Sequence, residues 1–241
     1  MNFAFISTNL QKLFKYQSYQ PLIVIICIFE QIYFKMKNLF QITLIIVILF
    51  TNCTSDKSNY KEEITQFQYE MNTHYADAEA SPLTEEDQKT FKALEFFDID
   101  KNYRVEAEFE LTPDTPIFEM PTTTDRLPLY RKYGIAHFTL NKKKLALSIY
   151  QNQKLMTSLE YAEHLFLPFN DTSNGKSTYE GGRFIDLEIP AEGSQTIVID
   201  FNKAYNPYCA YNLKYSCPIP PAENNLPVAI LAGVKAYDKQ H

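Results

Sequence analysis

The stretch Tyr103-Arg104-Val105-Glu106-Ala107-Glu108-Phe109-Glu110-Leu111 alternates between apolar and polar residues along its whole length. Successive side chains of a β-strand point to opposite faces, so this alternation is typical of a strand with one buried and one solvated face. Upstream of Phe97 the apolar residues follow a helical spacing instead. The sequence therefore predicts a β domain over residues 99–238.

The same two-residue period recurs along the chain as far as Phe201, with turn signals such as Asn141 to Lys144, Gly181-Gly182 and Gly193-Ser194 between the segments. About seven or eight short strands without helices between them predict an antiparallel sheet rather than a parallel α/β sheet. We expect a mainly β fold with N-terminal helices (α+β), built as an antiparallel β-sandwich or a partly closed barrel. The further strand candidates are Ala136/Phe138/Leu140, Leu145/Leu147/Ile149, Leu165 to Phe169, Ile185/Leu187/Ile189, Ile197/Ile199/Phe201 and Val228 to Leu231.

Residues 61–98 carry the helical signal. Apolar residues at three-to-four spacing are separated by acidic and amide residues, which predicts an amphipathic helix whose apolar stripe packs on the core. Thr84 can then cap a second, short helix, because the acidic residues that follow it suit the first turn of a helix. The stripe consists of Tyr60, Ile64, Phe67, Met71 and Tyr75.

The residues ahead of these helices predict export. Met36-Lys37-Asn38 is followed by the apolar run Leu39 to Phe50 and then by Thr51-Asn52-Cys53. A cationic start, an apolar run of about 7–15 residues and a short cleavage site make a secretory signal, and a cysteine directly after it is the pattern of a bacterial lipoprotein. We expect residues 36–52 to be a lipoprotein signal peptide and Cys53 to be lipidated, which anchors the protein to a membrane of the cell envelope.

Two flanking segments complete this interpretation. Residues 1–35 lie upstream of a complete signal, which favours an upstream extension of the predicted reading frame with the true start at Met36. Residues 53–60 are polar and favour a flexible tether. A plain signal peptide and a signal anchor are the alternatives to a lipoprotein.

One segment interrupts the alternating pattern. Residues 202–225 form a long irregular loop, rich in Tyr, Asn and Pro, inside an otherwise compact β domain. Loops of this length are uncommon unless they are functional or disordered, and the aromatic content argues against disorder. This loop is therefore the segment that looks least like scaffold.

Several stretches of the domain are distinctive. They are Asp200-Phe201-Asn202-Lys203-Ala204-Tyr205-Asn206-Pro207-Tyr208-Cys209-Ala210-Tyr211-Asn212, Ser216-Cys217-Pro218-Ile219-Pro220-Pro221-Ala222-Glu223-Asn224, Tyr130-Arg131-Lys132-Tyr133-Gly134 and Thr178-Tyr179-Glu180-Gly181-Gly182-Arg183-Phe184-Ile185-Asp186-Leu187-Glu188. They resemble the family catalogued as domain of unknown function 1684, over roughly residues 81 to 235. Tyr215 stands where many relatives carry a tryptophan. The family has no assigned activity, so the resemblance implies a domain and no mechanism.

Cys209 and Cys217 lie in the irregular loop. Export would place them in a compartment that permits disulfides, and a bridge across so small a ring would contribute roughly 2.5 kcal/mol by chain entropy. Free buried thiols that line a core or a pocket are an alternative, and a metal or catalytic site is another. The spacing lacks the Cys-x-x-Cys or paired His pattern that is usual for zinc.

Polar residues near the loop suggest a binding site. Alternation places Asp186 and Glu188 opposite Ile185, and Asp200 opposite Ile199. If these faces converge inside a barrel, their side chains can bind a polar ligand or perform acid–base chemistry; if not, they form a solvated outer face, and His164 is then structural or exposed. The candidate ligand-binding residues are Arg183, Asp186, Asp200, Asn202, Tyr205, Asn206, Tyr208, Tyr211, Asn212 and Glu223.

The remaining signals limit the function. The chain has no Gly-x-Ser-x-Gly elbow, His-Glu-x-x-His motif, P-loop or dinucleotide-binding glycine pattern, so we predict no cofactor and no metal. The net charge of −6 argues against nucleic acid as a partner. We expect a membrane-anchored envelope lipoprotein that binds a small polar ligand or serves as an accessory module. The alternative is an envelope hydrolase that uses Asp200, Glu223 or His137 as acid or base.

Overall fold

The computed structural model describes residues 55–237 of the chain. The chain divides into two compact units, residues 1–59 and residues 60–241, and the described structure belongs almost wholly to the second unit. The predicted extension, the signal peptide and Cys53 lie outside the described residues. Within the described part, no helix has the length and apolar character that crossing a bilayer requires.

Two α-helices come first, as the sequence predicts. Helix α3 spans Ser55–Ala76, so it begins inside the stretch expected to be a tether. Ile64 and Tyr75 of its apolar stripe are buried, with 0% and 2% of their surface exposed. Helix α4 spans Glu85–Thr90, and the Thr84 hydroxyl caps it by accepting the Asp87 backbone N–H at 3.1 Å. The amphipathic helix and the capped helix are both confirmed.

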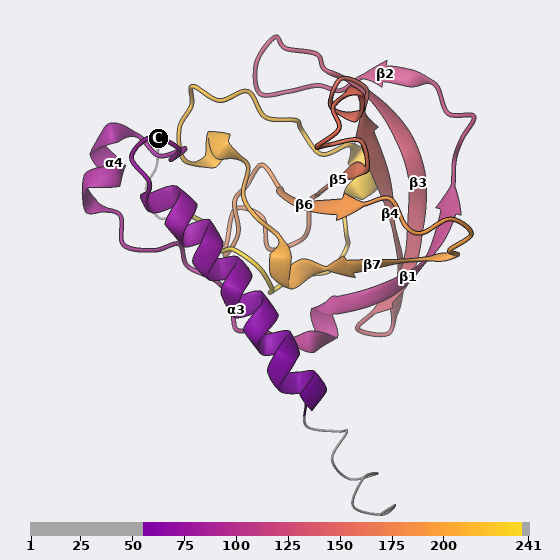
Figure 1. Cartoon of the computed structure of the whole chain (residues 1–241), viewed down its shortest axis with the longest axis horizontal. Coiled ribbons are helices and arrows are strands. Elements are labelled where there is room, and N and C mark those ends of the chain that lie inside the picture. The colour runs from indigo at the N-terminus through magenta and orange to yellow at the C-terminus, as the bar shows by residue number, and fades with distance from the viewer. Residues whose placement is uncertain (1–54, 238–241) are drawn as a thin grey trace, which may run out of the picture. The chain divides into compact units, whose positions relative to one another are not determined.

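The β domain is one antiparallel sheet in the order β6-β5-β4-β3-β1-β7, with β2 paired to β3. Figure 1 shows the strands curling so that the sheet forms a partly closed barrel, with α3 and α4 on one side and β2 and β3 on the other. Of the two predicted architectures, the partly closed barrel is therefore confirmed. The strands are β1 (Arg104–Leu111), β2 (Ile117–Glu119), β3 (Leu129–Leu140), β4 (Lys143–Asn152), β5 (His164–Phe169), β6 (Arg183–Glu188) and β7 (Thr196–Asp200), and the 3-10 turns are η1 (Lys101–Tyr103), η2 (Leu155–Thr157), η3 (Phe201–Lys203), η4 (Tyr208–Ala210) and η5 (Ala222–Asn224).

A tight hairpin joins the two longest strands, β3 and β4. Asn141 and Lys142 take positive φ angles of 50° and 64°, which is the conformation of a two-residue turn that matches the twist of the flanking strands. The turn fixes the register, so that Leu140 lies opposite Lys143. The turn predicted from Asn141 to Lys144 is confirmed.

The inner face of the curled sheet is the main core. Its side chains come from alternate positions of every long strand, as in β1, where Val105, Ala107 and Phe109 are buried and the residues between them are exposed. Because the side-chain period is two, this register leaves the other face of each strand outside the barrel. On β6, Ile185 points into the core and Asp186 points out.

The segment Val228 to Leu231 corrects one prediction, because it forms no strand. Val228 and Ile230 are buried in the main core, so the apolar run was correctly identified as interior. Its backbone, however, is held by side chains: Arg183 Nη2 donates to the carbonyl of Ile230 at 2.7 Å, and Asp171 accepts the Ile230 N–H at 3.2 Å. Because the N–H and C=O of Ile230 already bond to side chains, they do not pair with a neighbouring strand.

Candidate functional site: a pocket on the outer face of the sheet

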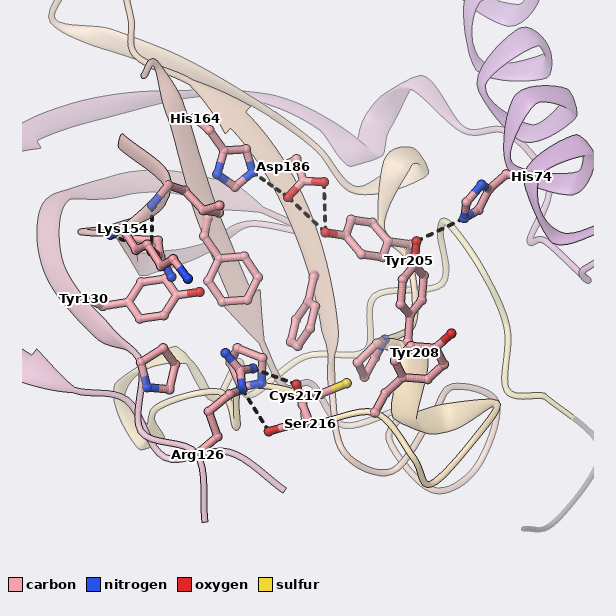
Figure 2. Close-up of a pocket in the computed structure, with 18 of the residues that line it drawn as sticks. His74, Arg126, Tyr130, Lys154, His164, Asp186, Tyr205, Tyr208, Ser216 and Cys217 are labelled. Carbon is pink, nitrogen blue, oxygen red and sulfur yellow. Dashed lines mark hydrogen bonds and ion pairs between the residues drawn. The ribbon is translucent and has the colours of Figure 1, made fainter. Parts of the chain in front are cut away.

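A cavity of about 1050 Å³ lies on the outer face of β3, β5 and β6. Its other walls come from α3, from the connection between β4 and β5, and from the irregular 202–225 loop. Figure 2 shows that side chains from all these elements point into one space. The cavity lies at the upper end of the range of about 300–1,000 Å³ that is usual for ligand pockets.

The floor of the pocket is aromatic. Tyr130, Phe166 and Phe184 are buried there, with 5–6% of their surface exposed. The rings of Phe166 and Phe184 meet edge to face with centroids 4.8 Å apart, a favourable arrangement for aromatic pairs. Alternation explains the floor, because Phe184 precedes the inward-facing Ile185 on β6 and therefore points outward.

One end of the pocket is polar. Asp186 Oδ1 lies 2.9 Å from His164 Nε2, and the Tyr205 hydroxyl donates to both oxygens of Asp186 at 2.9 Å. The Asp186 side chain is 53% exposed, so its carboxylate keeps contact with the cavity and solvent. Burial, reinforced by the charge of Asp186, holds the pKa of Tyr205 well above its usual value. Tyr205 therefore stays protonated and acts as a hydrogen-bond donor.

The irregular loop and α3 together form a second wall. The Tyr208 hydroxyl lies 3.1 Å from His74 Nε2, and the two rings stack with centroids 6.3 Å apart. Below them, Tyr75 and Tyr211 meet edge to face at 4.9 Å. These contacts tie the loop to the helix, so that the wall is built from two segments far apart in sequence.

Two cations stand at the opposite side of the floor from α3. Arg126 donates from Nε to the Ser216 hydroxyl at 3.0 Å and from Nη2 to the Ser216 carbonyl at 2.7 Å. Lys154 lies at the start of η2 and lines the same cavity. Figure 2 places them on either side of Tyr130. Both side chains are exposed, so their charges lie at the mouth of the pocket rather than at its floor.

Comparison with known proteins identifies the domain. The profile of the family described as Protein of unknown function (DUF1684) matches residues 89–235. The chain belongs to this family. A solution NMR structure of an uncharacterized protein of Haloarcula marismortui is similar to this DUF1684 chain at 30% identity, covering 77% of this chain and 98% of that one with a TM-score of 0.60. No curated protein matched the chain.

Of the predicted ligand-binding residues in this DUF1684 domain, Asp186, Tyr205 and Tyr208 line the pocket. The others lie elsewhere. Asn206 and Tyr211 are buried beside the pocket wall, where Asn206 donates to the Tyr211 hydroxyl at 3.2 Å. Asn212 donates to the carbonyl of Leu83 at 3.5 Å and so joins the loop to the segment before α4.

Arg183 lies inside the core, with none of its side chain exposed. It pairs with Asp171 at 2.9 Å and donates to the backbone carbonyls of the C-terminal segment, including Ile230 and Val234. Burial lowers the pKa of Arg183, although Asp171 opposes that effect. The residue before Arg183 has to be a glycine. Gly182 has a φ of +91°, and a Cβ added there would lie 2.6 Å from Asn170 Oδ1, so no side chain fits.

Asp200 and Asn202 form a separate cluster with α3. The Tyr60 hydroxyl donates to both oxygens of Asp200, at 3.0 and 2.9 Å, and accepts from Asn202 Nδ2 at 2.9 Å. Arg104 lies 3.8 Å from the same carboxylate. This cluster attaches α3 to the end of β7, and none of its members lines the pocket.

Glu223 and His137 are also separate from each other and from the pocket. Burial alone would raise the pKa of Glu223, but the hydrogen bonds that it accepts from Lys132 Nζ and the Tyr150 hydroxyl together lower it. His137 lies 3.2 Å from Glu110 on the exposed face of β3 and β1. The predicted acid–base residues Asp200, Glu223 and His137 therefore have different partners and do not converge.

Cys209 and Cys217 are both free and buried, so the structure contains no bridge between them, and the disulfide stays a prediction. They are in contact, since the Cys209 N–H donates to Cys217 Sγ at 3.1 Å. Hydrogen bonds from the Cys217 thiol and from Tyr179, working against burial, lower the pKa of Cys209 to about 7. The Cys217 thiol donates a hydrogen bond to the Cys209 sulfur, and this bond, together with burial, raises the pKa of Cys217. Cys217 also lines the pocket.

Sequence reasoning missed His164, Arg126, Lys154 and the aromatic floor. A signal for part of this set was present: His164 and Phe166 share one face of a strand, as do Phe184 and Asp186, and both faces lie opposite apolar core positions. No comparable signal existed for Arg126 and Lys154, which lie outside regular strands. Among the described residues, no group of three His, Cys, Asp or Glu side chains is placed to hold a metal ion.

Proposed function

We propose that this protein is an envelope lipoprotein, anchored through Cys53, that binds a small ligand in the outer-face pocket. The observation that carries the binding proposal is the pocket itself: a cavity of about 1050 Å³ with a buried aromatic floor and a few convergent polar groups. Sites of this composition bind organic molecules, because the apolar floor supplies affinity and the polar groups supply orientation. The sequence pattern around Cys53 supports the anchoring part of the proposal.

The polar end supports recognition rather than chemistry. Asp186 accepts from both His164 and Tyr205, so the three side chains hold one another in place while the exposed part of the carboxylate faces the cavity. Such a preorganised acceptor can bind a hydroxyl or amine of a ligand without rearranging. We do not propose a hydrolase, since Asp200, Glu223 and His137 have separate partners and none lines the pocket.

The test is a thermal unfolding screen of the full-length chain, reconstituted in phosphatidylcholine nanodiscs and followed by circular dichroism, against a library of small organic molecules. A ligand present at about 100 times its Kd stabilises the folded state by about 2.7 kcal/mol, which raises the unfolding temperature measurably. Leu129→Glu places a charge on the apolar wall and should abolish that shift. Leu129 and Leu127 are similarly exposed, at 50% and 48%, but only Leu129 lines the cavity, so Leu127→Glu is the matched control.

The outcomes are distinct. A ligand that stabilises the wild type and Leu127→Glu, but not Leu129→Glu, supports the pocket as a binding site. Stabilisation that survives in Leu129→Glu places the ligand elsewhere and contradicts the proposal. A library that stabilises nothing contradicts it as well. Export and anchoring are tested separately by metabolic labelling with a fatty acid, which Cys53→Ala should abolish.

A further inference from the structure

We propose that the pocket takes an anionic amphiphile, with its acyl chain on the aromatic floor and its charged head group between Arg126 and Lys154. This inference rests on the proposed function and narrows it to one class of ligand. Three features of the site carry it: where the apolar surface lies, where the cations lie, and what surrounds the mouth.

The apolar surface lies at the bottom of the cavity. Tyr130, Phe166 and Phe184 are almost fully buried, and Leu129 and Leu155 extend the apolar wall toward solvent. No carboxylate lies on the floor: Glu70 stands on α3, and Asp186 stands at the polar end. A compact polar ligand would leave most of this surface uncovered, whereas an acyl chain gains about 0.8 kcal/mol for each methylene that it buries there.

The cations lie at the mouth, and no acidic side chain in the described part of the chain neutralises them. Among residues 55–237, neither Arg126 nor Lys154 has a carboxylate within ion-pair distance. Ser216 holds Arg126 by accepting from its Nε and Nη2, which fixes the guanidinium without neutralising it. A fixed and unneutralised cation beside a lysine is complementary to a carboxylate or phosphate head group.

The two acidic groups of the lining are placed so that they do not oppose this arrangement. Asp186 is engaged by His164 and Tyr205 at the polar end. Glu70 accepts from Gln66 within α3 at 2.9 Å, on the wall formed by the helix. The head group and these carboxylates therefore occupy different sides of the pocket.

The exposed residues Leu129 and Leu155 make part of the cavity rim apolar. In the connection between β4 and β5, Leu155 and Met156 are each 37% exposed, Tyr161 is 40% exposed and Leu159 is fully exposed. Leu129, the first residue of β3, is 50% exposed. Exposed apolar surface of this kind marks contact with membranes or apolar partners. A ligand that is itself drawn from a membrane accounts for such a rim next to the mouth.

The chain contains no tryptophan, which allows a direct test. Leu155→Trp places a single indole in the pocket wall, and Leu111→Trp places one on an exposed position at the end of β1, outside both the cavity and its rim. Each full-length variant is reconstituted in phosphatidylcholine vesicles, which contain no other protein, and titrated with a fatty acid brominated near its methyl end, which quenches indole on contact. We expect saturable quenching of Leu155→Trp only.

Competition against this probe identifies the head group. Myristate and lysophosphatidylglycerol test the carboxylate and phosphate sources, and monomyristin and lysophosphatidylcholine are their neutral and zwitterionic counterparts. We expect the anionic compounds to compete about twentyfold better. Replacing either cation should reduce that preference about fivefold, the upper end for an exposed charge pair. The double variant Arg126→Gln with Lys154→Gln should abolish it, and Lys144→Gln, an exposed lysine outside the lining, should leave it unchanged.

Each other outcome overturns the inference. Equal competition by neutral amphiphiles removes the role of the cations, and equal quenching of both tryptophan variants indicates simple partition into the bilayer. If compounds without an acyl chain stabilise the protein through the pocket while the brominated probe fails to quench, the amphiphile is wrong and the proposed function stands. If neither experiment detects binding, both fall.

Discussion

Each of the two faces of strand β6 carries a side-chain pair with a carboxylate, and the two pairs have the same length but different surroundings. On the inner face Arg183 pairs with Asp171, and on the outer face Asp186 pairs with His164, each at 2.9 Å. Both side chains of the inner pair are fully buried, whereas those of the outer pair are 22% and 53% exposed. Distance alone therefore says nothing about the role of either pair.

The surroundings of the two pairs decide what each can do. Arg183 also donates to backbone carbonyls of the 230–234 segment, and Asp171 accepts from Ser173 and from the Ile230 N–H. These bonds fasten an irregular segment that does not pair as a strand. Within residues 55–237, Asp186 accepts from side-chain donors only, and 53% of its side chain stays exposed. The inner pair thus specifies structure, and the outer pair leaves a carboxylate available at the edge of a cavity.

The largest effect should come from breaking the inner pair. Arg183→Met removes the cation and leaves Asp171 as a buried charge without its partner, which typically costs about 3–5 kcal/mol. Urea unfolding followed by circular dichroism measures the loss. Adding Asp171→Asn should recover part of it, because the second change removes the uncompensated charge. A loss for Arg183→Met below about 1 kcal/mol would mean that the inner pair does not hold the segment.

The next effect concerns Asn224, which fastens the irregular loop to strands β4 and β5. Asn224 Nδ2 donates to the carbonyls of Ser148 and Pro168 at 2.8 and 2.6 Å, and its Oδ1 accepts the Ser148 N–H at 2.8 Å. Asn224→Ala should cost about 2–3 kcal/mol, since it leaves buried backbone groups unsatisfied. Asn225 is exposed, so Asn225→Ala should cost under about 1 kcal/mol. Equal losses in the two variants would remove the distinction.

The outer pair should contribute little to stability. His164→Gln should change the free energy of unfolding by less than about 1 kcal/mol, because the partner carboxylate is half exposed and solvent screens the interaction. The same urea titration that measures Arg183→Met provides the comparison. If His164→Gln destabilised the protein as much as Arg183→Met, the outer pair would be structural as well.

The smallest effect on the fold concerns the thiols on the pocket side. Because the pKa of Cys209 is lowered to about 7, its thiolate fraction should rise through pH 7, and alkylation by iodoacetamide should follow with a midpoint there. Cys217, whose pKa is raised, should react far more slowly. Peptide mass spectrometry separates the two sites. Cys217→Ala removes the hydrogen bond to Cys209 and should move the midpoint up toward about 8.5; a wild-type midpoint already at that value would contradict the assignment.

The candidate site was only partly predictable. Alternation placed Asp186 opposite Ile185 and therefore outside the core, which the structure bears out. The same rule places Arg183, two positions before Ile185, on the inward face, but it gives no reason for a charged side chain to be buried there. The partner that makes burial tolerable, Asp171, lies in a turn without a pattern of its own. A charged side chain can be buried only where a partner compensates its charge, and only the tertiary structure brings that partner close.

By itself, the sequence determined the two N-terminal helices, most of the strands, the hairpin at Asn141 and Lys142 and an antiparallel sheet, and it left a sandwich and a partly closed barrel as alternatives. These depend on side-chain period and backbone conformation, which neighbours along the chain decide. Only the tertiary structure decided that the outer face of β5 and β6 is a pocket wall rather than a solvated surface. Helix α3 and the irregular loop, far apart in sequence, meet through His74 and Tyr208 and enclose that face. The cavity forms between segments that are distant in the sequence, so no local sequence pattern predicts it.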